Sequence, residues 1–187
     1  MQIGILKNTA RVELCQDLLV QLKVPVMAEF LGKLANDPAH QNMTLVEAVA
    51  TMASQELESR AQKRQERFIQ RSGLRELSVW NQADVTKVIL TKERNLKEQD
   101  LRRLMTCEWI DHGKNVLVSG ATGTGKTWML AVLGKQACIY GCRTQYYRYP
   151  RLLELLADAR EHRESATFRR NLNRNKLLTV SYTHLRA

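Results

Sequence analysis

The residues Gly120-Ala121-Thr122-Gly123-Thr124-Gly125-Lys126-Thr127 fit the pattern G-x-x-x-x-G-K-[ST]. They lie between an apolar run typical of a short buried strand, residues 115–119, and a run with helical spacing, residues 126–140. Glycines let the backbone wind around a polyphosphate with its N–H groups pointing inward, and the following helix adds the positive end of its dipole. The stretch therefore predicts a phosphate-binding loop between a strand and a helix, which is how a parallel α/β core begins.

Two residues of this loop have specific expected roles. Lys126 is expected to reach the β- and γ-phosphates of a nucleotide, and Thr127 to ligate Mg²⁺ through its hydroxyl. Trp128 follows them directly and is included in the expected site. The expected cofactors are ATP and Mg²⁺. The expected cofactor-binding residues are Gly120, Ala121, Thr122, Gly123, Thr124, Gly125, Lys126, Thr127 and Trp128.

Composition limits the class of protein. The chain has 187 residues, a net charge of +10 and an isoelectric point near 9.7, which favours a polyanionic partner, with nucleic acid ahead of an anionic membrane. No run approaches the ~18 apolar residues of a membrane span, and the N-terminus lacks a secretory pattern, so a cytoplasmic location is expected. The cysteines and histidines show no metal-ligand spacing, so no structural metal is expected.

The N-terminal part reads as entirely helical. Helical segments are expected at residues 10–23 and 26–36, separated by Pro25. A third begins at Thr44, which forms a capping-box pattern with Glu47, and ends near Gly73. Its expected apolar side comprises Leu45, Val49, Met52, Ala53, Leu57, Ala61 and Phe68.

The second half of this third helix carries a row of basic residues. Four arginines lie within roughly 60° of one another on a helical wheel, and a lysine lies at their edge. A solvated helix face, contacts to DNA phosphates and contacts to an acidic protein partner all remain open interpretations. The candidate DNA-binding residues are Arg60, Lys63, Arg64, Arg67 and Arg71.

The remaining segments continue the α/β pattern. An extended stretch is expected at residues 85–90 and a helix at 96–110. Strands are expected at 115–119, at 143–149 and from 177 onward, with helices at 126–140, 150–161 and 165–174. Tyrosines 146, 147 and 149 with Arg148 could stack on bases, but packing in an edge strand is the favoured interpretation. The fold class is α/β, a parallel-sheet core preceded by an all-helical domain.

Several stretches together resemble the IstB-like helper ATPases of bacterial insertion sequences, relatives of the DnaC-type helicase loaders within the AAA+ class of P-loop NTPases. Besides the loop, residues 27–31, 101–110, 115–120 and 147–153 carry the resemblance, which runs from about Asp17 to Leu178. The family commonly has His after the Lys-Thr pair, where this chain has Trp128.

The resemblance implies a domain order and a function. It implies a helical DNA-binding domain at 1–75, a linker at 76–95 and the N-terminal part of an AAA+ ATP-binding domain at 96–180. It also implies that the protein binds duplex DNA non-specifically, forms homo-oligomers when full length and activates a transposase in an ATP-dependent way. A DnaC-like helicase loader and a nucleotide-responsive DNA-binding module that does not hydrolyse ATP are the alternatives, and a small-molecule kinase is a weaker one.

The chain departs from the family pattern at its end. The family's strand beginning at Leu177-Leu178 ends in paired acidic residues, whereas Ser181–Ala187 contains no carboxylate. No catalytic residue is therefore visible, and ATP hydrolysis is expected to be impaired. Residues 181–187 are expected to be a non-native tail on a copy that is truncated at the C-terminus, which leaves the sheet incomplete.

Overall fold

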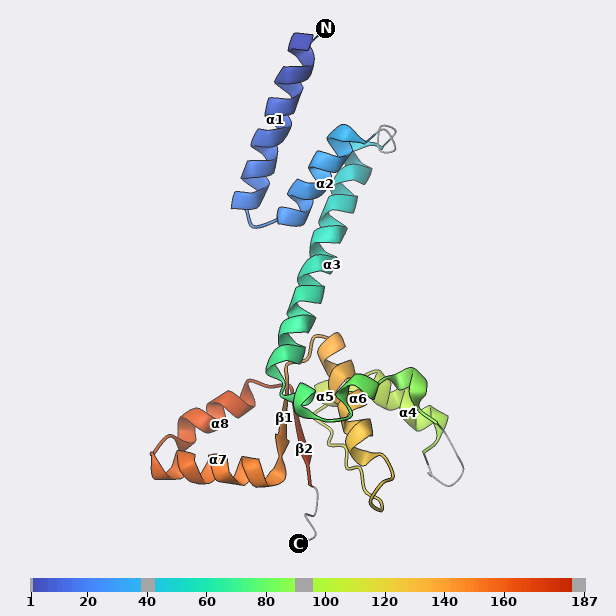
Figure 1. The fold of residues 1–187 in the computed structure, drawn as a ribbon, viewed down its shortest axis with the longest axis vertical. Coiled ribbons are helices and arrows are strands. Elements are labelled where there is room, and N and C mark those ends of the chain that lie inside the picture. Colours follow the sequence, from blue (N-terminus) through green and yellow to red (C-terminus); the bar gives the residue numbers. More distant parts are fainter. Residues whose placement is uncertain (1, 38–42, 90–95, 183–187) are drawn as a thin grey trace. The chain divides into compact units, whose positions relative to one another are not determined.

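The protein is described here by a computed structural model that covers residues 2–37, 43–89 and 96–182 (Figure 1). It divides into two compact units, Met1–Lys63 and Arg64–Ala187. The division falls inside helix α3 (Leu45–Arg71). Each unit has its own buried residues and is described separately below.

The first unit is helical, as expected. Helix α1 (Gln2–Gln21) and helix α2 (Pro25–Asn36) pack against each other as a hairpin (Figure 1). Helix α1 starts well before the expected residue 10. The turn between the helices contains Lys23 with φ of 62°, and Pro25 opens α2 because a first-turn position needs no backbone N–H.

Helix α3 begins and ends where its sequence signals predict. The Thr44 backbone N–H donates to Glu47 Oε2 over 2.8 Å, and the Glu47 N–H donates to Thr44 Oγ1 over 3.3 Å. This confirms the capping box. Gly73, with φ of 73°, adopts the left-handed conformation that follows many helix ends.

The expected apolar side of α3 is wrong in part. Met52 is buried, but Leu45 and Leu57 are 81% and 67% exposed. The buried side carries Ala48, Met52 and Glu56, which recur every four residues and so share one face of the helix.

In the second unit, residues 74–87 form a strap of short 3₁₀ turns across α6 (Lys126–Ile139). The turns are η2 (Leu74–Glu76), η3 (Trp80–Gln82) and η4 (Val85–Lys87). The expected extended stretch at 85–90 is therefore wrong for residues 85–87, whereas Val88 is extended and Leu90 lies outside the described residues. Asp84 Oδ1 accepts the Thr86 N–H over 3.0 Å, which bends the chain into a turn.

Two further expected helices differ in their boundaries. The segment expected as one helix at 96–110 is divided into α4 (Glu98–Met105) and α5 (Glu108–Asp111), because Cys107 between them has φ of 59°. Helix α6 ends just before Gly141, which confirms that glycine as its stop.

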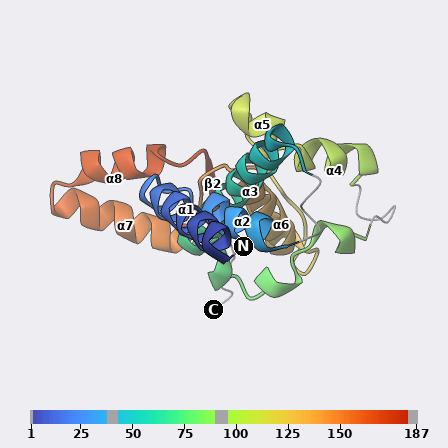
Figure 2. The same ribbon diagram turned by 90° about the horizontal axis from the view of Figure 1, so that it is seen from above.

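The sheet consists of two parallel strands, β1 (Thr144–Arg148) and β2 (Leu177–Ser181). Thr144 is opposite Leu177 and Arg148 is opposite Ser181. Helices α7 (Tyr149–Glu161) and α8 (Ser165–Asn173) connect the strands and lie side by side in both views (Figures 1 and 2). The two later expected strands and the helices between them are confirmed.

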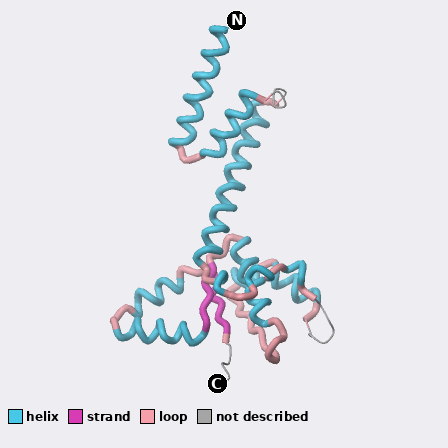
Figure 3. Tube along the Cα trace, in the orientation of Figure 1, coloured by secondary structure: helices cyan, strands magenta, loops and turns pink. Residues whose placement is uncertain are grey.

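The expected strand at 115–119 is wrong. Residues 114–120 have no regular structure, Leu117 is 92% exposed, and β1 and β2 are the paired strands among the described residues (Figure 3). A β-strand needs a neighbour to accept its backbone hydrogen bonds, and this segment has none within the described part of the chain. The fold is α/β, mostly helical with a small parallel sheet.

The core of the second unit lies where the strap, α6 and β1 meet. Its buried residues are Leu74, Leu77, Ala83, Ala131, Val132, Cys138 and Tyr146. A second cluster joins Cys107, Ile110, Ala137 and Leu177. None of the helices described for residues 2–182 is long and apolar enough to span a membrane.

Candidate nucleotide-binding site

The glycine-rich loop has the backbone that its sequence predicts. Gly123 and Gly125 have φ of 84° and 89°, conformations that residues with a Cβ rarely adopt. Residues 120–125 are exposed, and Gly125 is the N-cap residue directly before α6. The loop therefore presents its backbone to solvent directly before a helix N-terminus.

Lys126 closes this loop with its side chain. Its Nζ donates to the carbonyl oxygens of Gly120 and Ala121 over 2.8 and 2.6 Å. Thr124 Oγ1 also donates to the Ala121 carbonyl, over 2.9 Å. The ammonium group of Lys126 therefore lies against the loop backbone that would bind an anion.

The first turn of α6 adds donors to this loop. The first bond within the helix runs from the Met129 N–H to the Gly125 carbonyl over 2.9 Å. The N–H groups of Lys126, Thr127 and Trp128 precede that bond, so the helix itself offers them no acceptor. Together with the helix dipole, they favour an anion at this end of α6.

Trp128 anchors α6 to the strap. Its indole N–H donates to the Gln82 carbonyl over 3.0 Å. One residue farther along the strap, the Ala83 carbonyl accepts from Lys135 Nζ over 3.2 Å, and that ammonium lies 5.3 Å from the centre of the Trp80 ring. The side chain of Trp128 thus has a packing role, and its backbone N–H remains in the first turn of α6.

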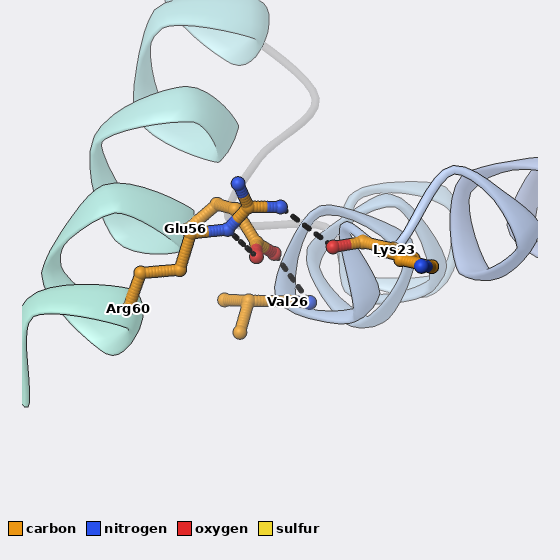
Figure 4. A network of polar contacts seen from close by, with 4 residues as sticks. All are labelled: Lys23, Val26, Glu56 and Arg60. Carbon is orange, nitrogen blue, oxygen red and sulfur yellow. Dashed lines mark hydrogen bonds and ion pairs between the residues drawn. The ribbon is translucent and has the colours of Figure 1, made fainter. Parts of the chain in front are cut away.

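Arg60, one of the candidate DNA-binding residues, has contacts within the first unit (Figure 4). Its Nε donates to Glu56 Oε1 over 2.8 Å, and a terminal nitrogen donates to the Lys23 carbonyl over 2.6 Å. Glu56 Oε2 accepts the Val26 N–H over 2.9 Å. Arg60 therefore joins α3 to the turn between α1 and α2.

Glu56 is a buried carboxylate, with 6% of its surface exposed. Burial by itself raises its pKa, but hydrogen bonds from Arg60 and from the backbone N–H groups of Val26 and Met27, with the charge of Arg60, outweigh that effect. The pKa of Glu56 therefore lies below its usual value of 4.5. The carboxylate also lies at the N-terminus of α2, where a negative charge is favourable.

Arg64, another candidate, lies beside the end of α6. Its guanidinium lies over Gly141, 3.7 Å from the position that a Cβ would take there. Gly141 follows the last turn of α6, where a cation interacts favourably with the helix dipole. The other candidates, Lys63, Arg67 and Arg71, are exposed on α3.

Helix α8 contributes a further basic surface. It contains no acidic residue, and Arg169, Arg170 and the following Arg174 are all exposed. None of these three arginines forms an ion pair with another described residue. The sequence signal for this surface is a helical run that contains arginines and no carboxylate.

The chain is an α/β protein in which a glycine-rich loop leads into a helix packed beside parallel strands. Its candidate phosphate site lies at the N-terminus of that helix. Comparison with protein families is specific: the family described as IstB-like ATP binding protein matches residues 17–184. The chain therefore belongs to the family of IstB-like ATP binding proteins.

Individual relatives agree with this family. The chain is 35% identical over 138 residues to a protein of Pseudomonas fluorescens described as an insertion sequence IS1162 ATP-binding protein, covering 74% of this chain and 58% of the relative. It is 30% identical over 164 residues to the insertion sequence ATP-binding protein y4uH of Sinorhizobium fredii, covering 88% and 64%. The chain thus spans less than two thirds of the length of these relatives.

Proposed function

We propose that this chain is an ATP-binding helper protein for DNA transposition, which binds duplex DNA without sequence preference and activates a transposase when ATP is bound. The observation that carries the proposal is the loop at residues 120–127. Gly123 and Gly125 have positive φ, Lys126 donates to two carbonyls of the loop, and the first turn of α6 follows directly. Family membership supports ATP as the nucleotide.

The roles within the loop follow from its geometry. The backbone N–H groups of the loop and of the first helical turn would bind the phosphates. Lys126 would exchange its two carbonyl acceptors for phosphate oxygens. Thr127, the second residue of α6, would add its backbone N–H to the donors of that first turn.

ATP binding is tested by calorimetric titration of ATP into the protein. Lys126→Ala is expected to weaken ATP binding at least about tenfold, which corresponds to 1.4 kcal/mol. Lys114→Ala, which removes an exposed lysine just ahead of the loop, is the matched control and is expected to keep the wild-type affinity. Absence of ATP binding by the wild-type protein would contradict the proposal.

The DNA-binding part of the proposal rests on basic residues of both units. The net charge of +10 supports a polyanionic partner, and exposed basic residues on α3 and α8 supply sites for phosphate contacts. The proposal assigns the contacts of α3 to Lys63, Arg67 and Arg71, which are exposed on that helix. Such contacts carry no sequence information.

A pair of double variants tests this assignment. Arg67→Glu with Arg71→Glu is expected to weaken duplex binding and to flatten its dependence on salt. Arg102→Glu with Arg151→Glu makes the same change in net charge at exposed arginines of α4 and α7, outside the assigned surface, and is expected to have a smaller effect. Equal losses in the two double variants would contradict the assignment to α3.

The transposase part is tested in a strand-transfer assay with the transposase of the same insertion sequence. Addition of the protein with ATP is expected to stimulate strand transfer, and addition of Lys126→Ala is expected to stimulate it less. Equal strand transfer with and without the protein would contradict this part alone, because ATP binding is measured separately.

A further inference from the structure

The carboxyl end of β2 lies at the same end of α6 as the phosphate loop. Ala137, near the end of α6, packs with Leu177 at the start of β2. Tyr146, in the middle of β1, belongs to the same core cluster as Ala131 and Val132, which lie nearer the start of α6. Both strands therefore run antiparallel to α6, so their carboxyl ends approach the N-terminus of that helix (Figure 1).

The lengths of these segments agree with that direction. From Ala137 back to Lys126 the helix rises about 16 Å, at ~1.5 Å per residue. From Leu177 to Ser181 the strand advances about 13 Å, at ~3.3 Å per residue. The end of β2 thus comes within about one helical turn of the loop along the axis of α6.

The face of β2 that meets α6 ends in a hydroxyl group. Leu177, Thr179 and Ser181 alternate on the buried face, and Leu178 and Val180 are on the exposed one. Ser181 is 9% exposed, and its Oγ lies 2.7 Å from the phenol oxygen of Tyr146. Residues 165–187 contain no Asp or Glu, so this end of the strand carries no carboxylate.

These residues do not fit a Mg²⁺ site of the usual kind. Mg²⁺ in proteins is bound through one or two carboxylates plus substrate phosphates, and in P-loop NTPases an aspartate at a strand end accompanies the loop Ser or Thr. Here Thr127 has no such partner at the end of β2. Among the described residues no group of three His, Cys, Asp or Glu could hold a metal ion.

We infer that the end of β2 is a hydroxyl-lined edge of the nucleotide site, where Ser181 paired with Tyr146 takes the place of a metal-binding carboxylate, so that this chain binds ATP largely independently of Mg²⁺. The inference rests on the proposed function, because it concerns how the same site holds ATP. Its physical basis is that affinity comes from the loop N–H groups and Lys126, which act on the phosphates with or without a metal ion.

The first experiment measures the dissociation constant of ATP for the wild-type protein in excess MgCl₂ and in excess EDTA. The two values are expected to differ by less than about threefold, where each tenfold corresponds to 1.4 kcal/mol. A difference of tenfold or more would overturn the inference. If ATP fails to bind under both conditions, the proposed function fails instead, so the two failures are distinguishable.

Substitutions at the strand end test the position of Ser181. Ser181→Asp is expected to raise the ratio of the two dissociation constants to tenfold or more, because it places a carboxylate at the end of β2 that approaches the loop. Ser181→Asn, of the same size without the charge, is expected to keep the wild-type ratio. Val180→Asp is the matched control, since it adds the same charge one residue away on the exposed face.

Every outcome of this set bears on the inference. An equal rise of the ratio of dissociation constants in Ser181→Asp and Val180→Asp would show that any added charge acts at a distance. That result would overturn the assignment of Ser181. Should Ser181→Asp fail to fold in a thermal melt, Tyr182→Asp replaces it, because Tyr182 is exposed and next to Ser181. No rise with a folded carboxylate variant at either position would also overturn the assignment.

Discussion

The indole N–H of Trp128 donates a hydrogen bond to the backbone carbonyl of Gln82, 46 residues earlier in the chain, over 3.0 Å. Trp128 belongs to the first turn of α6 and Gln82 to the strap, so this bond holds the start of the candidate nucleotide site against residues 74–87. A residue that the sequence assigns to nucleotide contact thus also fixes the position of the loop.

Trp128→Phe removes this donor and keeps the aromatic ring. It is expected to lower the free energy of unfolding by about 0.5–1.5 kcal/mol, the usual net value of one hydrogen bond, and to weaken ATP binding. Trp109→Phe is the control, since it removes a comparable bond, from Trp109 Nε1 to the Leu104 carbonyl over 2.9 Å, away from the loop. If both variants change ATP affinity equally in calorimetric titrations, the positioning role of Trp128 is wrong.

Gly134→Ala tests the contact between α6 and the strap. A Cβ at Gly134 would lie 2.8 and 2.9 Å from the two terminal carbons of Leu74, which is fully buried. The variant is expected to lose about 1–3 kcal/mol in chemical denaturation, as overpacked cores do. Gly32→Ala is the control: its Cβ meets the flexible amide of Gln16, so a smaller loss is expected, and an equal loss would contradict the packing argument.

The network around Glu56 predicts how the first unit responds to acid. Because the folded pKa of Glu56 is below the usual 4.5, its ionised form is favoured by folding. Its contribution to stability is present above pH 4.5 and is lost as the pH falls through the folded value. The free energy of unfolding of the wild type should therefore fall below pH 4.5, measured by helical circular dichroism in urea.

Glu56→Gln is the comparison for this pH dependence. It keeps an oxygen acceptor but cannot ionise, so its stability should be lower than that of the wild type at pH 7 and should change less between pH 7 and pH 3. If the free energy of unfolding changes with pH by the same amount in the wild type and in Glu56→Gln over this range, the assigned role of Glu56 is contradicted.

The cysteines are expected to differ in reactivity. Burial, with smaller effects of neighbouring groups, raises the pKa of Cys107 and the pKa of Cys138 to about 11, whereas Cys15 is exposed. Because the thiolate is the reactive form, iodoacetamide at pH 8 should label Cys15 first and leave Cys107 and Cys138 unlabelled until the protein unfolds. Mass spectrometry of the labelled peptides measures this order, and early labelling of Cys138 would contradict it.

Local signals in the sequence predicted the elements that depend on neighbouring residues. The capping box of Thr44 and Glu47, the stop at Gly73 and the start of α6 after the loop all act within a few residues of the chain. The sheet strands from Thr144 and Leu177 were predictable for a related reason, since their apolar pattern and the helices between them define a parallel crossover.

Contacts between distant residues had no such signal. The helical wheel places Arg60 and Arg64 in one basic row, but it contains no information about the Lys23 carbonyl or about Gly141. The apolar pattern of residues 115–119 predicts a strand, yet a strand also requires a paired neighbour. The turn at Asp84-Val85-Thr86 could have been predicted, because an aspartate side chain often accepts the backbone N–H two residues later and so favours a turn.

The backbone around β1 decides on which side this sheet can grow. The Tyr146 N–H donates to the Ser72 carbonyl over 2.6 Å, and the Gln145 side-chain amide donates to the same oxygen over 3.3 Å. The edge of β1 away from β2 is thus occupied by the residue that follows α3. Any additional strand, from this chain or from another, would have to pair with β2. The free edge of β2 can therefore accept a strand, whereas Ser72 occupies the outer edge of β1.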